Sequence, residues 1–272
     1  MVALVVRGLE FAYPGGAPVL CGVDLDVRAG EVVCLIGPNG AGKSTLLRLC
    51  AGLIEPTAGT VSFAGQPLRD LPLRARAQRI GVVPQALRAL PAMRVRDFIA
   101  QGRYAHRARF ARSTPADHAA IERALDEADI RAFAERPLEE LSGGQRQRAL
   151  VARALAQEPE LVLVDEPTNA LDPRHQLQVF GLVAGLGCRG RAALAITHDL
   201  NLASQFATRI ALLDAGRIVA DGSVHEVLRA DVLEPVYRTR FETGAAPVAG
   251  WGEPRPWVLP WDAPARPDVT RP

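Results

Sequence analysis

Short apolar runs separated by polar turns recur along most of the chain, a pattern typical of an α/β protein. In the N-terminal part, strands are predicted over residues 2–6, 19–27 and 31–36, and a helix is predicted over 46–52. Later runs predict further strands over 59–63, 80–83, 161–164 and 192–196, and a closing hairpin over 209–220. The run at 161–164 is apolar at every position, which favours a strand buried on both faces of a parallel sheet.

The spacing of apolar residues changes from strand-like to helical between residues 86 and 140. Helices are predicted over 94–101 and 116–129, the second opening with Thr114 as its N-cap and Pro115 in its first turn. The segment is rich in arginine, which indicates either a solvated face or a docking surface for an acidic or polar partner. The arginines in question are Arg88, Arg94, Arg96, Arg103, Arg107, Arg109 and Arg112. The α/β pattern returns with a helix from about 142 to 157, and a short helix is predicted near 224–229.

These changes of pattern divide the chain into three parts. Residues 1–85 and 141–240 are expected to form one α/β core, and residues 86–140 an inserted helical subdomain. Residues 241–272 are rich in Gly, Pro and Ala and contain all three tryptophans, Trp251, Trp257 and Trp261. This tail is predicted to be an extended arm whose tryptophans pack on the core, with a regulatory or partner-binding arm as the alternative.

Composition excludes several classes of function. The chain of 272 residues carries a net charge of +2, which gives no reason to expect a nucleic-acid partner. No apolar run approaches the length needed to span a bilayer, and the first residues lack the features of a signal peptide, so a cytoplasmic location is expected. The four cysteines form no metal-binding pattern, and Cys34 and Cys50 are expected to be buried apolar residues.

A glycine-rich segment between a predicted strand and a predicted helix has the form of a phosphate cradle. Its residues are Gly37, Pro38, Asn39, Gly40, Ala41, Gly42, Lys43, Ser44 and Thr45. The glycines allow backbone N–H groups to converge at the positive end of the helix. Lys43 is expected to reach the β- and γ-phosphates of a nucleotide, and the Ser44 hydroxyl to ligate Mg²⁺.

Polar residues that end other predicted strands are candidates for the remaining chemistry. Asp165 and Glu166 follow the buried run at 161–164 and are expected at the edge of the sheet where ligands bind. Asp165 is predicted to face Mg²⁺, and Glu166 to act as the base that activates water. His198, after the next strand, is a candidate sensor of the γ-phosphate, and Gln85 is placed to touch the metal or a water.

A second anion-binding motif lies about a hundred residues after the first. Ser142 is predicted to cap a helix, and Gly143 and Gly144 expose the amides of its first turn before Gln145. One nucleotide has a single γ-phosphate, so it does not need two γ-phosphate sites in one chain. Two chains arranged head to tail would use both sites.

The order of these motifs resembles that of the ATP-binding subunits of ABC transporters, over the chain to about Phe241. Residues 37–45 resemble the Walker A motif, Gln85 the Q-loop, residues 141–145 the signature motif and residues 161–166 Walker B. Ala170, Leu171 and Asp172 resemble the D-loop, and His198 resembles the switch histidine. By this resemblance Tyr13 is the aromatic residue that stacks on adenine.

The segment Gly102-Arg103-Tyr104-Ala105-His106 is similar to an element of the importers for iron–siderophore, haem and cobalamin complexes. That element usually has proline where this chain has Ala105. The resemblance implies a P-loop NTPase with a RecA-like α/β core, an antiparallel β region and the helical insert. It implies a homodimer that sandwiches two ATP·Mg²⁺ between Lys43, Ser44 and Asp165 of one copy and the signature residues of the other.

The partners implied are integral-membrane permease subunits and, indirectly, a substrate-binding protein, with this chain peripheral on the inner face of the cell membrane. The alternative is an ABC ATPase that moves no solute, such as an assembly factor for iron–sulfur clusters. DNA-repair and ribosome-associated ABC proteins usually carry a long coiled-coil insert or two cassettes in one chain, and this sequence has neither.

Overall fold

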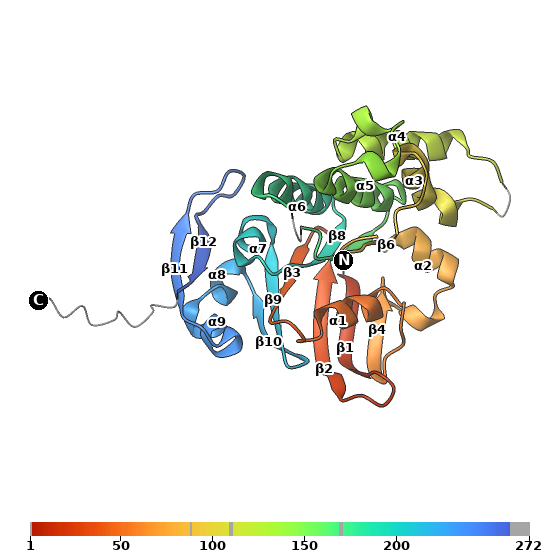
Figure 1. The fold of residues 1–272 in the computed structure, drawn as a ribbon. Coiled ribbons are helices and arrows are strands. Elements are labelled where there is room, and N and C mark those ends of the chain that lie inside the picture. The colour runs from red at the N-terminus through yellow and green to blue at the C-terminus, as the bar shows by residue number, and fades with distance from the viewer. Residues whose placement is uncertain (1, 88, 109–110, 169–170, 262–272) are drawn as a thin grey trace, which may run out of the picture.

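The computed structural model describes residues 2–87, 89–108, 111–168 and 171–261. Its centre is a six-stranded sheet with the order β10-β9-β3-β8-β7-β6 (Figure 1). The strands are β3 (Val32–Ile36), β6 (Ile80–Val83), β7 (Leu161–Asp165), β8 (Ala192–Ile196), β9 (Arg209–Asp214) and β10 (Arg217–Gly222). All neighbours are parallel except β9 and β10, which form the predicted hairpin. The carboxyl ends of the parallel strands therefore lie along one edge of the sheet.

A second, antiparallel sheet covers one face of the first. It has the order β2-β1-β4-β5, with β1 (Val2–Ala12), β2 (Pro18–Arg28), β4 (Ala58–Phe63) and β5 (Gln66–Pro67). Helix α1 (Lys43–Cys50) buries Leu46, Leu47 and Leu49 in the core between the two sheets. This packing fixes the start of α1 at the end of the loop that follows β3.

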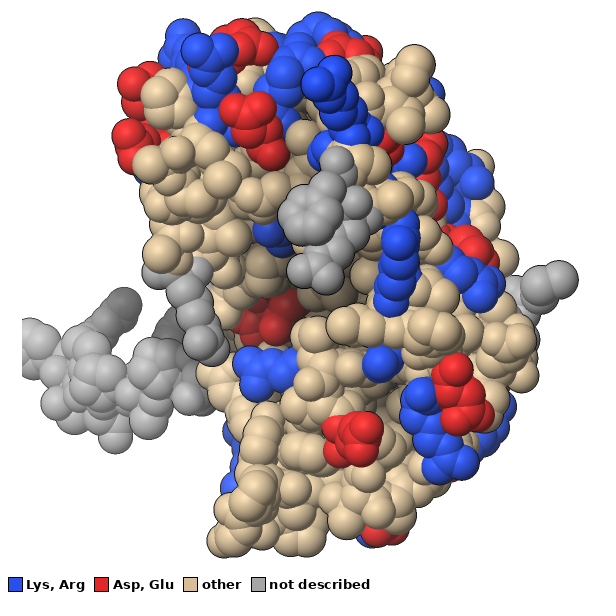
Figure 2. All heavy atoms as spheres, turned by 90° about the vertical axis from the view of Figure 1, so that its right-hand side faces the viewer, with Lys and Arg blue, Asp and Glu red and all other residues tan. Residues whose placement is uncertain are grey.

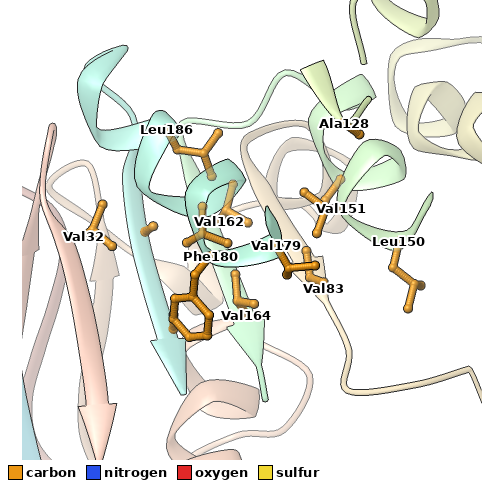
Figure 3. Close-up of a cluster of buried hydrophobic side chains, with 14 of the residues drawn as sticks. Val32, Val83, Ala128, Leu150, Val151, Val162, Val164, Val179, Phe180 and Leu186 are labelled. Carbon is orange, nitrogen blue, oxygen red and sulfur yellow. The ribbon is translucent and has the colours of Figure 1, made fainter. Parts of the chain in front are cut away.

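Helices cover the other face of the central sheet. They are α5 (Gly143–Ala156), α6 (Pro173–Cys188) and α7 (Leu200–Phe206), and Figure 3 shows Val151, Val179 and Phe180 packed over Val162 and Val164 of β7. Every residue of β3 is buried, with alternate side chains in the two cores. Cys34 and Cys50 are fully buried as expected, and burial raises the pKa of each thiol to about 12.

Short helices lie between β6 and α5, where the sequence predicted a helical subdomain. They are α3 (Val95–Ala100), α4 (Pro115–Glu127) and 3₁₀ turns at Gln101–His106, Arg131–Phe133 and Leu138–Glu140. Thr114 caps α4 in a reciprocal capping box with Asp117, so the predicted helix start is confirmed. Before this region the structure contains α2 (Leu73–Arg79) and the 3₁₀ turn Leu68–Asp70, which were not predicted. No helix in the described part of the chain is both long and apolar enough to cross a membrane.

Several arginines of this region are paired with acids, although Arg107 donates instead to the Ala111 carbonyl. Arg94 and Arg96 both contact Glu135, and Arg96 also contacts Glu122. Figure 2 shows basic and acidic side chains interspersed over the upper part of the face that it presents, above a hollow with acidic side chains at its bottom. Arg88 and Arg109 lie outside the described residues.

Arg103 fits neither predicted role, because it is buried and structural. Only 6% exposed, it donates from Nε to Asp117 Oδ1 at 3.0 Å and from its guanidinium to the Ala156 carbonyl at 2.9 Å. It also contacts the Glu158 carboxylate at 2.8 Å. The segment 102–106 thus joins the start of α4 to the end of α5.

The rest of this segment contacts the end of α5 and also α2. A Cβ on Gly102 would lie 2.2 Å from the Arg153 carbonyl oxygen, so only glycine allows the two backbones to approach. The His106 ring is 2.9 Å from the Gln157 carbonyl oxygen. The Ala105 carbonyl, at the position where proline is usual, accepts hydrogen bonds from Arg74 and Gln78 of α2.

The C-terminal part corrects the predicted extended arm. After α8 (Val224–Val227) and α9 (Ala230–Tyr237), the second of which was not predicted, the chain forms a hairpin of β11 (Phe241–Ala246) and β12 (Arg255–Pro260). Phe241 and Val258 join the main core, and Trp251 donates to the Gln205 carbonyl of α7, which agrees with the predicted packing of the tryptophans. Trp257 is 41% and Trp261 54% exposed, against that prediction. Cross-strand pairing produced strands here despite the prolines and glycines, because the prolines lie in a two-stranded sheet that has no central strand.

The buried Arg103–Asp117 pair predicts a measurable loss of stability when it is broken. Asp117→Ala should lower the free energy of unfolding by about 3 kcal/mol, because it leaves the buried Arg103 guanidinium without its buried carboxylate partner. Burial opposes ionisation of Asp117, but hydrogen bonds from Thr114 and Arg103 outweigh it and lower its pKa to about 2.

The loss of stability caused by Asp117→Ala should therefore depend on pH. An unfolded aspartate has a pKa of about 3.9, so the ionised carboxyl stabilises the fold above that pH and loses this contribution as the pH falls towards 2. Urea titrations of the wild type and Asp117→Ala should converge at low pH. The exposed Asp231→Ala is the control, and a loss for Asp117→Ala as small as the control's would contradict the structural role.

Candidate functional site

The glycine-rich segment has the geometry that a phosphate cradle requires. Gly37 has φ 145°, and a Cβ there would lie 2.0 Å from the Leu213 carbonyl oxygen. Gly42 has φ 106° and is the N-cap of α1, where no side chain caps the helix. A Cβ on Gly42 would lie 2.8 Å from the Leu20 side chain. The first-turn amides of α1 therefore lack a side-chain acceptor, which suits an anionic ligand.

Lys43 lies inside this cradle and is only 5% exposed. Its Nζ donates to the carbonyl oxygens of Gly37 at 2.8 Å and Pro38 at 2.9 Å. Burial lowers the pKa of Lys43, and the nearby Glu166 and Asp165 partly offset this effect. A cation desolvated in this way gains most from a strongly anionic ligand.

Ser44 and Asp165 form the candidate magnesium position. The Ser44 hydroxyl donates to Asp165 Oδ1 at 3.1 Å. Burial raises the pKa of Asp165, and the hydrogen bond from Ser44 counteracts part of that rise. A divalent cation would relieve this penalty, and hydroxyl and carboxylate oxygens are ligands that Mg²⁺ accepts.

No group of three or more His, Cys, Asp or Glu side chains that could hold a metal occurs among the described residues. Such a sparse protein ligand set fits Mg²⁺, which keeps several waters and binds substrate phosphates as well. The residues present therefore fit a nucleotide with Mg²⁺.

Glu166 lies where three parallel strands end. Its Oε1 is 2.5 Å from His198 Nε2, after β8, and its Oε2 accepts a hydrogen bond from Gln85 Nε2 at 3.2 Å, after β6. Its backbone has φ 44°, although proline follows it, and its N–H donates to the Ile196 carbonyl. This left-handed conformation is uncommon for a residue that is not glycine and occurs preferentially at functional sites.

The structure thus brings the predicted residues of four separate motifs into one place. A pocket of about 260 Å³ is lined by Val19, Asn39, Gly40, Gly42, Lys43, Ser44, Thr45 and Glu166. Asp165 does not line this pocket but is hydrogen-bonded to Ser44, which does. In the same way, His198 and Gln85 contact Glu166 in the pocket lining. Gly37, Pro38 and Ala41 are part of the same loop.

Tyr13 stands beside the first turn of α1. Its hydroxyl is 3.3 Å from Thr45 Oγ1, and the Arg48 guanidinium donates to it at 3.4 Å. Its ring meets Phe11 edge-on at a centroid distance of 4.8 Å and remains 41% exposed. One end of the tyrosine is therefore fixed while its ring is accessible.

The second glycine motif does not contribute to this pocket. Ser142 caps α5 in a reciprocal capping box with Gln145, as predicted for a helix start. Gly143 is exposed, and a Cβ on Gly144 would lie 2.4 Å from the His175 ring. None of these residues lines the pocket that Lys43 and Glu166 share.

Asp172 lies next to this second motif. It caps α6, accepts from the backbone N–H of His175 at 3.0 Å and lies 2.6 Å from His175 Nδ1. The hydrogen bond with His175 lowers the pKa of Asp172. Ala170 lies outside the described residues. His175 was missed from the sequence, although its position three residues after the capping Asp172 is a signal that could have identified it.

Comparisons with known proteins agree with this geometry. The family model described as ABC transporter matches residues 20–169. A cobalamin import ATP-binding protein of Halobacterium salinarum is 39% identical over 92% of this chain, which spans 62% of that relative's length. A hemin import ATP-binding protein of Rhodopseudomonas palustris is 40% identical over 94% of both chains.

Solved structures show the same likeness. The structure described as an inward-facing conformation of a putative metal-chelate type ABC transporter has a TM-score of 0.83 and 30% identity, covering 96% of this chain and 98% of that chain. A dimeric bacterial ABC transporter cassette has a TM-score of 0.72 and 30% identity, covering 81% of this chain and 98% of that chain. With its family model, its relatives and its fold in agreement, this chain belongs to the ABC transporter family.

Proposed function

We propose that this chain is the ATP-hydrolysing subunit of an importer that takes up a metal-chelate-type substrate, such as iron–siderophore, haem or cobalamin, through a separate permease. The observation that carries the proposal is the placement of Glu166 beside the phosphate cradle, between His198 and Gln85. The names of the relatives, which are hemin and cobalamin import proteins, support the substrate class and do not favour the alternative of an ATPase that moves no solute.

The cradle residues 37–45 bind the phosphates of ATP in this proposal, and Tyr13 stacks on the adenine. Lys43 exchanges its two carbonyl acceptors for phosphate oxygens, which suit its charge better. Ser44, Asp165 and Gln85 hold Mg²⁺. When bound, Mg²⁺ neutralises charge on the β- and γ-phosphate oxygens.

Glu166 acts as the base that orients and deprotonates the attacking water. Its two carboxylate oxygens are held by His198 and Gln85, which fixes its direction. The ring of His198 is the neighbour best placed to stabilise charge that develops on the transferred phosphoryl group. Asp165 accepts from Ser44, whereas Glu166 contacts His198 and Gln85, so the adjacent acids serve different tasks.

The second half of each site comes from a second copy of the chain. Ser142, Gly143, Gly144, Gln145 and Asp172 lie outside the pocket of their own chain and are available to the γ-phosphate bound by a partner. The likeness to a dimeric cassette supports this arrangement. ATP would then hold two copies together, and its hydrolysis would release them.

The transport path belongs to other chains in this proposal. Integral-membrane permease subunits hold the motor on the inner face of the cell membrane, and a substrate-binding protein delivers the cargo to them. Residues 1–85 and 141–240 act as the catalytic core and residues 86–140 as the helical subdomain. Gln85, at their boundary, passes the state of the site to the permease.

Glu166→Gln should reduce ATP hydrolysis at least about 10²-fold, because a glutamine cannot accept the proton of the water. ATP binding should be retained, and the variant should accumulate as an ATP-bound dimer on size-exclusion chromatography. Glu10→Gln, at an exposed position of β1, is the matched control. Turnover of Glu166→Gln near that of the control would show that Glu166 is not the base.

Lys43→Ala should instead weaken ATP binding by at least about tenfold, because it removes charge-assisted hydrogen bonds to the phosphates. Equilibrium titration with a fluorescent ATP analogue would measure this loss. Arg69→Ala, a change of an exposed cation in the 3₁₀ turn Leu68–Asp70, should change affinity much less. Equal affinities for the wild type and Lys43→Ala would refute the proposed phosphate site.

A further inference from the structure

The C-terminal hairpin, to which the proposed function assigns no role, is bound to helix α7. The Asn201 side chain donates from Nδ2 to the Val258 carbonyl at 3.0 Å and accepts from the Val258 N–H at 2.9 Å. One amide therefore satisfies both backbone groups of one residue in β12. Such a paired contact fixes position more strictly than apolar packing, because neither group can shift without losing a bond.

A second set of contacts holds the other end of α7. Arg255, only 5% exposed, donates from Nε to the Ser204 carbonyl at 2.7 Å and from its guanidinium to the Ala207 carbonyl. These are carbonyls at the C-terminal end of the helix, where a positive charge is favourable. Its guanidinium also lies 3.8 Å from the centre of the Trp251 ring, and Trp251 Nε1 donates to the Gln205 carbonyl at 2.7 Å.

Helix α7 begins two residues after His198, which contacts the proposed base Glu166. Asp199 caps it, accepting from the N–H groups of Asn201 and Leu202 at 2.9 Å. His198 precedes this cap and lies 2.5 Å from Glu166 Oε1. Asn201 thus joins the hairpin to the first turn of α7, three residues after His198.

Helix α7 has little stability of its own. It contains seven residues, and helices this short are marginal without tertiary contacts. Its buried residues are Leu202, Ala203 and Ser204. Hydrogen bonds of Asn201 and Arg255 join the hairpin to both ends of α7, and Figure 1 shows β12 beside this helix.

We propose that Asn201 is a positioning residue for ATP hydrolysis: by binding β12, it holds the first turn of α7 and so keeps His198 in contact with Glu166. The C-terminal hairpin is then part of the catalytic apparatus without touching the nucleotide. This inference rests on the proposed function, because it requires His198 and Glu166 to act in hydrolysis.

The test is a double-mutant cycle between Asn201 and His198 in the full chain, with the ATPase rate measured over a range of ATP concentrations. Asn201→Leu should lower kcat by about tenfold, because a small displacement of a catalytic group has effects of this order or larger. The KM for ATP should change less than twofold, because the cradle is untouched. In a His198→Ala background, Asn201→Leu should cause no further loss, since the residue through which it acts is absent.

Arg255→Met provides an independent disturbance of the same clamp, should Asn201→Leu fail to fold, and should show the same split between kcat and KM. Leu259→Ser, at a 47% exposed position of β12, is the matched control and should retain the wild-type kcat. Wild-type kcat in both Asn201→Leu and Arg255→Met would overturn the inference. So would an equal loss from Asn201→Leu with and without His198, which would indicate general destabilisation.

The same cycle separates failure of the inference from failure of the proposed function. If His198→Ala alone keeps the wild-type rate, the assignment of the site is wrong and the inference falls with it. If His198→Ala is impaired but the clamp variants are not, only the role of the hairpin is wrong.

Discussion

The site depends on one constraint, which is the alignment of parallel strands buried on both faces. Strands β6, β7 and β8 lie side by side and end at the same edge of the sheet. Gln85, Glu166 and His198 follow these three ends, so the sheet places them at one edge, where Glu166 contacts the other two. The phosphate cradle follows β3, which pairs with β8, and so opens beside them. Loss of register between any two of these strands would separate Glu166 from the cradle.

Burial sets the electrostatics at this edge. It lowers the pKa of Lys43 and raises that of Asp165, so both charges are costly until a ligand pairs with them. In the structure, the carbonyls of Gly37 and Pro38 accept hydrogen bonds from Lys43. The glycines therefore let the backbone adopt the shape of the cradle, while the buried charges of Lys43 and Asp165 favour a triphosphate with its metal.

The sequence predicted the parts that follow local rules. Fully apolar runs predicted β3, β7 and β8 nearly to the residue, and the Thr114 and Ser142 caps were correct because their hydrogen bonds are local. The site could be inferred because its residues end strands, where the topology rather than the side chains dictates their proximity. Their roles in binding and catalysis stay predictions.

What the sequence did not predict arises from contacts between distant segments. In the sequence Arg103 resembled the other arginines of its segment. Its burial and its hydrogen bonds to Asp117 and Ala156 follow only from the tertiary structure. The hairpin of β11 and β12 was missed because prolines and glycines weaken strand propensity. The hydrogen bonds that join it to α7, from Asn201 to Val258 and from Arg255 to Ser204, span some fifty residues of sequence. The left-handed backbone of Glu166 was also not predicted, because proline normally disfavours it in the preceding residue.

In the proposed function two copies of the chain share each catalytic site, and subunit mixing can measure this sharing. Lys43→Ala damages one half of the site and Ser142→Arg the other, so each variant alone should be inactive as a homodimer. A mixed dimer has one doubly damaged site and one intact site. After subunit exchange, an equal mixture should recover up to about a quarter of the wild-type rate, because half of the random dimers are mixed and each has one working site of two. If the mixture stays inactive, or if Ser142→Arg is fully active on its own, the catalytic sites are not shared between two copies.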